Sequence, residues 1–132
     1  MRTFQDAFKM LDAAAATGAG YAMDIASFRH FVLAIVTANS ANFTIKIQGS
    51  IQTTQPTWTS ASTPANQWNY VQALDLNDQS VVNGSAGVSA TGTDINRQLE
   101  VNTNGLRWVN VIITAYAAGN ITVLGMPFND NE

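Results

Sequence analysis

The only histidine in the chain, His30, is the first residue to consider for catalysis. It precedes a strongly apolar stretch, and the sequence contains neither a second histidine nor a cysteine. A catalytic histidine needs a nucleophile or a metal beside it, and the sequence proposes neither. We therefore expect His30 to be a structural side chain that is at least half-buried, and hydrolysis by a catalytic triad is excluded.

Carboxylates offer two further kinds of chemistry. Asp75, Asp78 and Asp94 flank loops and could bind Ca²⁺ through oxygen ligands, although aspartates at strand ends are more commonly turn caps. Asp24 and Glu100 could be a glycosidase pair, but nothing in the sequence brings them together. No glycine-rich phosphate loop lies between a strand and a helix. We expect no catalytic residue, no metal ligand and no cofactor.

Two tryptophans, Trp58 and Trp68, lie in the polar segment from Gln52 to Asn69, which we predict to be a long loop. Such long loops are uncommon in a compact domain unless they are functional or pack on a partner. The tryptophans could stack on sugar rings, or they could anchor a neighbouring subunit. Alternatively, both fold back over their own domain. We favour this for Trp68, and a partner contact for Trp58.

Composition narrows the class of protein. The 132 residues suffice for one domain, and only 11% are charged, against about 25% in an average soluble protein. The net charge of -3 and the scattered lysines and arginines argue against nucleic-acid binding. We see no secretory signal, and the apolar run Phe31 to Val36 is far too short to span a membrane. We expect a soluble protein that is made in the cytoplasm.

The segment from Ile95 to Phe128 carries the strongest local signal. Leu99 and Val101 alternate with polar residues, as in a half-buried strand. Asn104-Gly105 is typical of a two-residue type I′ hairpin turn, and Ala118-Gly119-Asn120 predicts a second turn. We therefore predict a meander of three consecutive antiparallel strands.

The middle strand of this meander has one face that is neither plainly apolar nor plainly polar. Trp108, Ile112 and Tyr116 share that face with Asn110 and Thr114. Such a mixed face usually meets another surface. We expect Trp108, Ile112 and Tyr116 to contact a partner.

Further strands are expected earlier in the chain. His30 to Ala38 is nearly continuously apolar, which is typical of a central strand covered on both faces. Asn39 to Asn42 is predicted to turn the chain into Phe43 to Gln48, where apolar and polar residues alternate. Tyr21 to Ile25 and Tyr70 to Leu76 also have strand character. In contrast, Phe4, Phe8 and Leu11 at helical spacing favour a short helix near the N-terminus.

These patterns predict an all-β fold, an antiparallel β-sandwich of about eight strands. A jelly-roll-like arrangement is favoured over an immunoglobulin-like one, because the Cys and Trp hallmarks of the latter are missing. Residues 1–16 would be an N-terminal arm or first strand, and residues 17–132 a single sandwich domain.

Two stretches resemble small jelly-roll structural proteins of tailed-bacteriophage virions, of the capsid decoration (cement) type. The first comprises Met10-Leu11-Asp12-Ala13-Ala14, Thr17-Gly18-Ala19-Gly20, Asp24-Ile25, Phe28-Arg29 and Ile47-Gln48-Gly49-Ser50. The second comprises Tyr70 to Asp75, Gly105 to Trp108 and Gly119 to Val123. The resemblance implies that residues 8–14 are extended, where helix propensity predicts a helix.

The resemblance also implies a non-enzymatic function in the virion. The expected partners are the major capsid protein or another virion protein, and further copies of the chain, for example in a trimer. A tail or fibre component and a carbohydrate-binding β-sandwich are the alternatives. In the arm we expect Phe4 and Phe8 to contact the partner, while Leu11 closes the chain's own sandwich.

Overall fold

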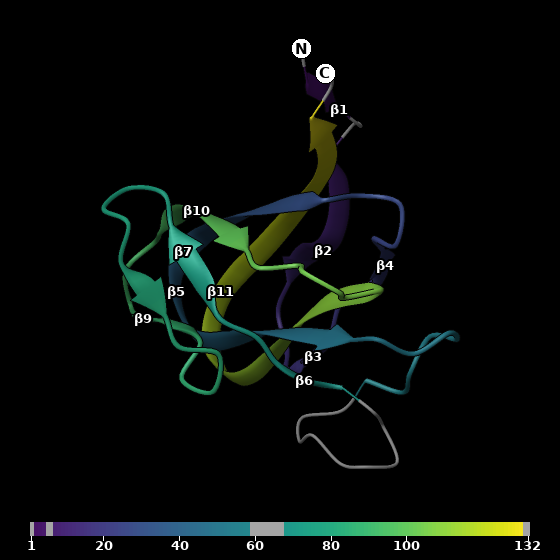
Figure 1. The fold of residues 1–132 in the computed structure, drawn as a ribbon. Coiled ribbons are helices and arrows are strands. Elements are labelled where there is room, and N and C mark those ends of the chain that lie inside the picture. Colours follow the sequence, from purple (N-terminus) through teal and green to yellow (C-terminus); the bar gives the residue numbers. More distant parts are fainter. Residues whose placement is uncertain (1, 5–6, 59–67, 131–132) are drawn as a thin grey trace.

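The computed structural model describes residues 2–4, 7–58 and 68–130, and these ranges form eleven strands and no helix (Figure 1). Every strand pairing among them is antiparallel. The predicted all-β antiparallel fold is confirmed, with eleven strands among the described residues where about eight were expected. The strands are β1 (Arg2–Phe4), β2 (Phe8–Ala14), β3 (Gly18–Ala19), β4 (Met23–Asp24), β5 (His30–Ser50), β6 (Asn69–Tyr70), β7 (Ala73–Asp75), β8 (Val81–Val82), β9 (Val88–Thr91), β10 (Asn96–Val101) and β11 (Trp108–Asp130).

Two long strands, β5 and β11, form a ribbon that is folded over on itself (Figure 1). They are paired from Trp108 and Ser50 at one end to Phe128 and His30 at the other. The ribbon bends in the middle, so its two halves belong to two different layers. This is the arrangement of a jelly-roll-like sandwich.

Each half of the ribbon is widened into a sheet by shorter strands. In the first sheet, β1 and β2 flank the second half of β11, while β10, β7 and β8 follow the first half of β5. In the second sheet, β3 and β4 flank the first half of β11, and β6 and β9 flank the second half of β5. None of the described segments is a helix that could cross a bilayer.

The core lies between the two layers. Strand alternation turns one set of apolar side chains inward from each half of the ribbon. From β5 these are Phe31, Leu33, Ile35, Phe43, Ile45 and Ile47, and from β11 they are Val109, Val111, Ile113, Ile121 and Val123. All of them are buried, so the ribbon supplies side chains to both walls of the core.

The bend of the ribbon depends on unusual backbone angles. Asn39 and Ser40 of β5 have φ of 65° and 56°, and Gly119 of β11 has φ of 92°. A Cβ atom at Gly119 would lie 2.5 Å from the Cα of Ala41, which is fully buried. The turns predicted at residues 39–42 and 118–120 are therefore parts of a single bend of the ribbon, the first on β5 and the second on β11. The residues on either side of each continue to pair across the ribbon.

Asp94, just before β10, clasps the β5 side of this bend. Its carboxylate accepts hydrogen bonds from the backbone N–H groups of Ala41 (3.0 Å) and Ser40 (3.2 Å), and from the hydroxyl of Thr37 (3.2 Å). The Thr37 hydroxyl in turn accepts the N–H of Ile95 at 2.8 Å. These donors, above all the Ala41 N–H, lower the pKa of Asp94.

The predicted C-terminal meander is wrong in its pairing. Leu99 and Val101 are buried as expected, but within the described residues β10 pairs with β5 and β7 and not with β11. At Asn104-Gly105 only the glycine has a positive φ, whereas a type I′ hairpin needs positive φ at both residues. This turn therefore sends the chain into the other sheet.

The N-terminal helix favoured by propensity is also wrong, whereas the extended conformation implied by the resemblance is confirmed. Residues 8–14 form β2, which pairs with β11 through an irregular register, with Ala13 at a φ of 49°. The irregularity lets the consecutive residues Met10 and Leu11 both reach the core. Burying such a side chain contributes about 1.5–3 kcal/mol, more than the helix propensity of a residue.

We expect Gly119→Ala to destabilise the protein by about 2–5 kcal/mol, because left-handed strain and a clash with Ala41 add together. Gly92→Ala is the matched control, since Gly92 has φ of 74° with open space around it, and strain alone should cost about 1–2 kcal/mol. Urea unfolding measures both. Equal losses would show that contact with Ala41 does not fix the bend.

Asp94→Asn should lower stability at neutral pH and make it less sensitive to acid. The folded-state pKa of Asp94 is lowered, so its stabilisation is present above the unfolded value of about 3.9 and is lost as pH falls through the folded value. The stability difference between wild type and variant should therefore shrink towards pH 2. A difference that stays constant between pH 7 and pH 2 would contradict the proposed clasp.

Candidate functional site

Apolar side chains cover the outer side of the first sheet, away from the core. On β5, Val32 and Ala34 are half-buried and Val36 is 39% exposed. On β11, Leu124 lies opposite Ala34 and Met126 lies opposite Val32. We call this surface, completed by the exposed Leu76, the outer apolar face. Within the described residues this face is only partly covered.

The outer apolar face is hollowed. A concavity of about 380 Å³ is lined by residues of β5, β10, β11 and the segments beside β2 and β7, namely Ala7, Val32, Ala34, Leu76, Gln98, Leu124, Gly125, Met126 and Phe128. None of these residues carries a charge. An uncharged, apolar concavity on a sheet is suited to a protein partner whose own contact surface is apolar.

The sequence carried a signal for this surface. The nearly continuous apolar run from His30 to Ala38 predicted a strand covered on both faces. In the structure the inner residues are buried by the core, while the outer residues remain partly exposed. The run therefore predicts a more complete cover of the outer side than the described residues supply.

The outer side of the second sheet is covered, in contrast, by aromatic residues of the chain. Trp68 is only 4% exposed, and its indole N–H donates to the carbonyl of Thr57 at 2.9 Å. The Trp68 ring contacts Trp58 on one side and Tyr70 on the other. The ammonium group of Lys46 lies 4.8 Å from the centre of the Tyr70 ring. Burial raises the pKa of the Tyr70 hydroxyl.

Of the predictions for Trp58 and Trp68, the structure tests only the one for Trp68. Trp68 folds back over its own domain, as favoured. Trp58 is half-buried against Trp68, with ring centres 6.1 Å apart, and its contact with a partner stays a prediction. The part of the predicted loop at residues 59–67 lies outside the described residues.

The predicted contact face on β11 needs correction. Ile112 is only 3% exposed, because residues of its own chain enclose it, so it offers no open surface to a partner. Trp108 is half-buried, and its indole N–H donates to the carbonyl of Gln52 at 3.1 Å. Tyr116 packs against the core, and its hydroxyl donates to the carbonyl of Gly119 at 2.7 Å. Trp108 and Tyr116 thus bond within the chain, and their contact with a partner stays a prediction.

The arm residues are placed differently. Phe8 is 41% exposed at the start of β2, beside Ala7 in the concavity of the outer apolar face. Phe4 lies in β1, in register with Phe128 of β11. Leu11 joins the core, as expected. The exposure of Phe8 is compatible with the predicted contact with a partner, which stays a prediction. The side chain of Phe4 is not among those that the structure describes.

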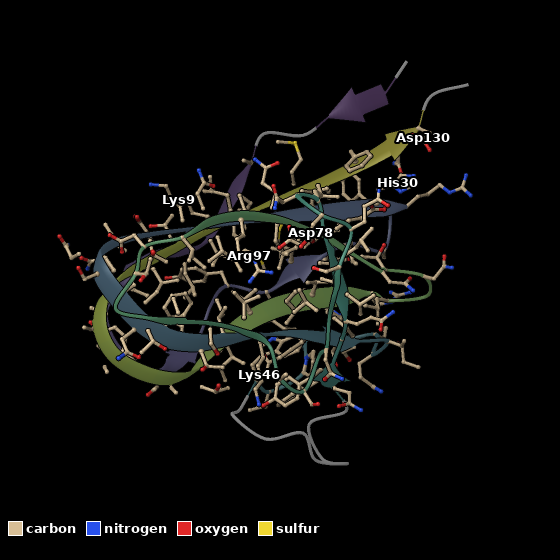
Figure 2. All side chains as sticks on the ribbon, turned by 90° about the vertical axis from the view of Figure 1, so that its left-hand side faces the viewer. Lys9, His30, Lys46, Asp78, Arg97 and Asp130 are labelled. Atoms are coloured by element: carbon tan, nitrogen blue, oxygen red, sulfur yellow. The ribbon has the colours of Figure 1, made fainter. Side chains whose placement is uncertain are left out.

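His30 is half-buried at the end of the first sheet, as expected. Its ring stacks on Phe128 with centres 4.9 Å apart, and its Nε2 lies 2.9 Å from a carboxylate oxygen of Asp130 (Figure 2). Asp24 and Glu100 are on separate strands without a contact between them, so no pair of glycosidase geometry is formed.

Asp75 and Asp78 cap their own turns, whereas Asp94 accepts its hydrogen bonds from the bend of β5. Asp75 is buried, accepts the N–H of Asn77 at 2.9 Å and is paired with the guanidinium of Arg97. These two interactions lower its pKa, in that order of size. Asp78 accepts the N–H of Ser80 at 2.9 Å. Within the described part of the chain, no three acidic or histidine side chains gather as metal ligands.

Comparison with known proteins identifies the fold. No protein-family model and no curated protein matches the sequence. The solved structure of the SPBc2 prophage-derived protein YomS is similar, with a TM-score of 0.72 and 15% identity, over 97% of this chain and 95% of YomS. The PBSX exported protein XepA is also similar, with a TM-score of 0.68 and 14% identity, over 96% of this chain but only 38% of XepA.

We expect a chelator to leave the melting temperature unchanged, because the loop aspartates are satisfied by N–H groups and by Arg97. Thermal unfolding with and without EDTA measures this. A decrease of more than about 5 °C, near the shift for about 1 kcal/mol in a domain of this size, would instead indicate a bound Ca²⁺ ion.

Proposed function

We propose that this protein is a non-enzymatic structural component of a bacteriophage virion, which binds another virion protein through the outer apolar face. The observation that carries the proposal is the hollowed, uncharged surface around Val32, Ala34, Leu124 and Met126. A monomer rarely leaves a contiguous apolar patch of this kind without a partner. The similarity of the fold to a prophage-derived protein over nearly its whole length supports a phage context.

Within the virion, we propose a capsid decoration protein that binds the major capsid protein in many copies. The low charge of the chain suits a permanent interface, because amide and apolar groups are buried at a smaller desolvation cost than ions. A tail or fibre component is the alternative location. Self-association on the particle, for example as a trimer, is part of this proposal.

The carbohydrate-binding alternative has less support. Its basis was a pair of tryptophans in a loop, and Trp68 is buried with its N–H bonded inside the chain. Trp58 is half-buried and its ring packs against that of Trp68, so part of the ring is already covered. Binding to a glycan array would nevertheless favour this alternative.

Leu124→Lys should reduce binding to particles of the phage that encodes the chain by at least about thirtyfold, because it places a charge in an apolar contact. Tyr21→Lys is the matched control, since Tyr21 is exposed away from the outer apolar face. Cosedimentation measures binding, and thermal unfolding checks the fold. Equal binding by both variants would exclude this face as the docking surface.

Deleting residues 1–7 should abolish assembly but change thermal stability little. Among these residues, β1 pairs only with the end of β11, whereas the core contribution begins at Met10. The same cosedimentation and thermal unfolding measure both effects. Normal assembly of the truncated protein, or a large loss of stability, would show that the arm serves the fold and not the interface.

A further inference from the structure

Two of the chain's arginines, Arg29 and Arg107, line one concavity at the end of the sandwich. The concavity measures about 470 Å³ and lies where the segment before β5 meets the turn between β10 and β11. Among the described residues, neither an aspartate nor a glutamate lines it. The positive charges that are scattered in the sequence are thus partly gathered by the fold.

The backbones of both arginines are held in place. The Arg29 N–H donates to the side chain of Asn129 at 2.8 Å, and its carbonyl accepts the hydroxyl of Thr103 at 3.1 Å. The Arg107 N–H donates to the carbonyl of Ser50, and its carbonyl accepts the N–H of Ile25, at 2.9 Å and 2.8 Å. The two guanidinium groups therefore extend from fixed positions.

The guanidinium groups themselves are not used by the fold. Among the described residues, neither Arg29 nor Arg107 has an ion pair or a side-chain hydrogen bond. The other described cations differ: Arg97 is paired with Asp75, Lys9 with Asp12, and Lys46 lies over Tyr70. In the described part of the molecule, two unpaired arginines thus share a concavity that no acidic residue lines. Such a site is suited to an anion, even in a chain of net charge -3.

The other residues that line the concavity indicate what kind of molecule bears the anionic group. The side-chain amide of Asn104 also makes no hydrogen bond within the described residues, and so adds donors to those of the arginines. Phe28, Leu106 and the 69% exposed Ile51 supply apolar walls. In the adjoining concavity, which shares Arg29 and Asn104, Glu100 provides an acceptor. An anion attached to an organic group fits these surroundings better than a free ion.

We propose that this concavity binds a phosphate monoester, with Arg29 and Arg107 holding the phosphate and the apolar walls holding its organic group. Planar guanidinium groups donate two parallel hydrogen bonds to phosphate oxygens, and the tetrahedral dianion can accept from both arginines and from Asn104. The proposal is independent of the outer apolar face, which lies on the first sheet and shares no lining residue with this concavity.

Glucose 6-phosphate is the probe, with inorganic phosphate and glucose as comparisons. Amide shifts in ¹⁵N-labelled full-length protein should locate binding at residues 28–30 and 103–107, and calorimetry gives the affinity. We expect glucose 6-phosphate to bind more tightly than inorganic phosphate, and glucose to show no binding. Arg29→Gln and Arg107→Gln should each weaken the binding at least about tenfold, the loss expected for a charge-assisted hydrogen bond.

Lys9→Gln is the matched control, because it also removes one exposed positive charge, and Lys9 lies in a part of the molecule away from His30 (Figure 2). It should leave the affinity unchanged. Equal weakening by Lys9→Gln, full affinity in either arginine variant, or no binding of glucose 6-phosphate would overturn the proposal. Binding of inorganic phosphate as tight as that of the ester would overturn the assignment to a monoester.

Discussion

The pairing of β5 with β11 is the interaction on which the rest of the structure depends. Seven of the other strands bond directly to this ribbon, namely β1, β2, β3, β4, β6, β9 and β10. Because the ribbon belongs to both layers, its bend sets the distance between them and decides which side chains face the core. The Asp94 clasp and Gly119 fix that bend from opposite strands.

Local signals in the sequence predicted many of the extended segments and inward-facing residues, although not the strand at Phe8–Ala14. Leu99, Val101 and the alternating residues Phe43, Ile45 and Ile47 are buried as predicted. What local signals could not supply was the partner of each strand. Asn104-Gly105 suggested a hairpin, yet β10 pairs with β5, far away in the sequence, because a strand's neighbour is chosen by burial across the whole domain.

The same distinction applies to the candidate sites. The apolar run from His30 to Ala38 predicted two covered faces, and the structure buries only the inner one, so the cover of the outer apolar face stays a prediction. The mixed face around Ile112 misled at that residue, because Ile112 is already buried within its own chain. The sequence alone could not predict that Arg29 and Arg107 line the same concavity, because only the folded ribbon brings their segments together.

The two ends of the described chain lie side by side, with Arg2 in register with Asp130 on β1 and β11 (Figure 1). A domain whose ends are adjacent can be placed within a loop of another protein, or be circularly permuted, without stretching its host. A fold of this kind can therefore be used both alone, as its similarity to almost all of YomS illustrates, and as one module of a longer chain, as its similarity to a part of XepA illustrates.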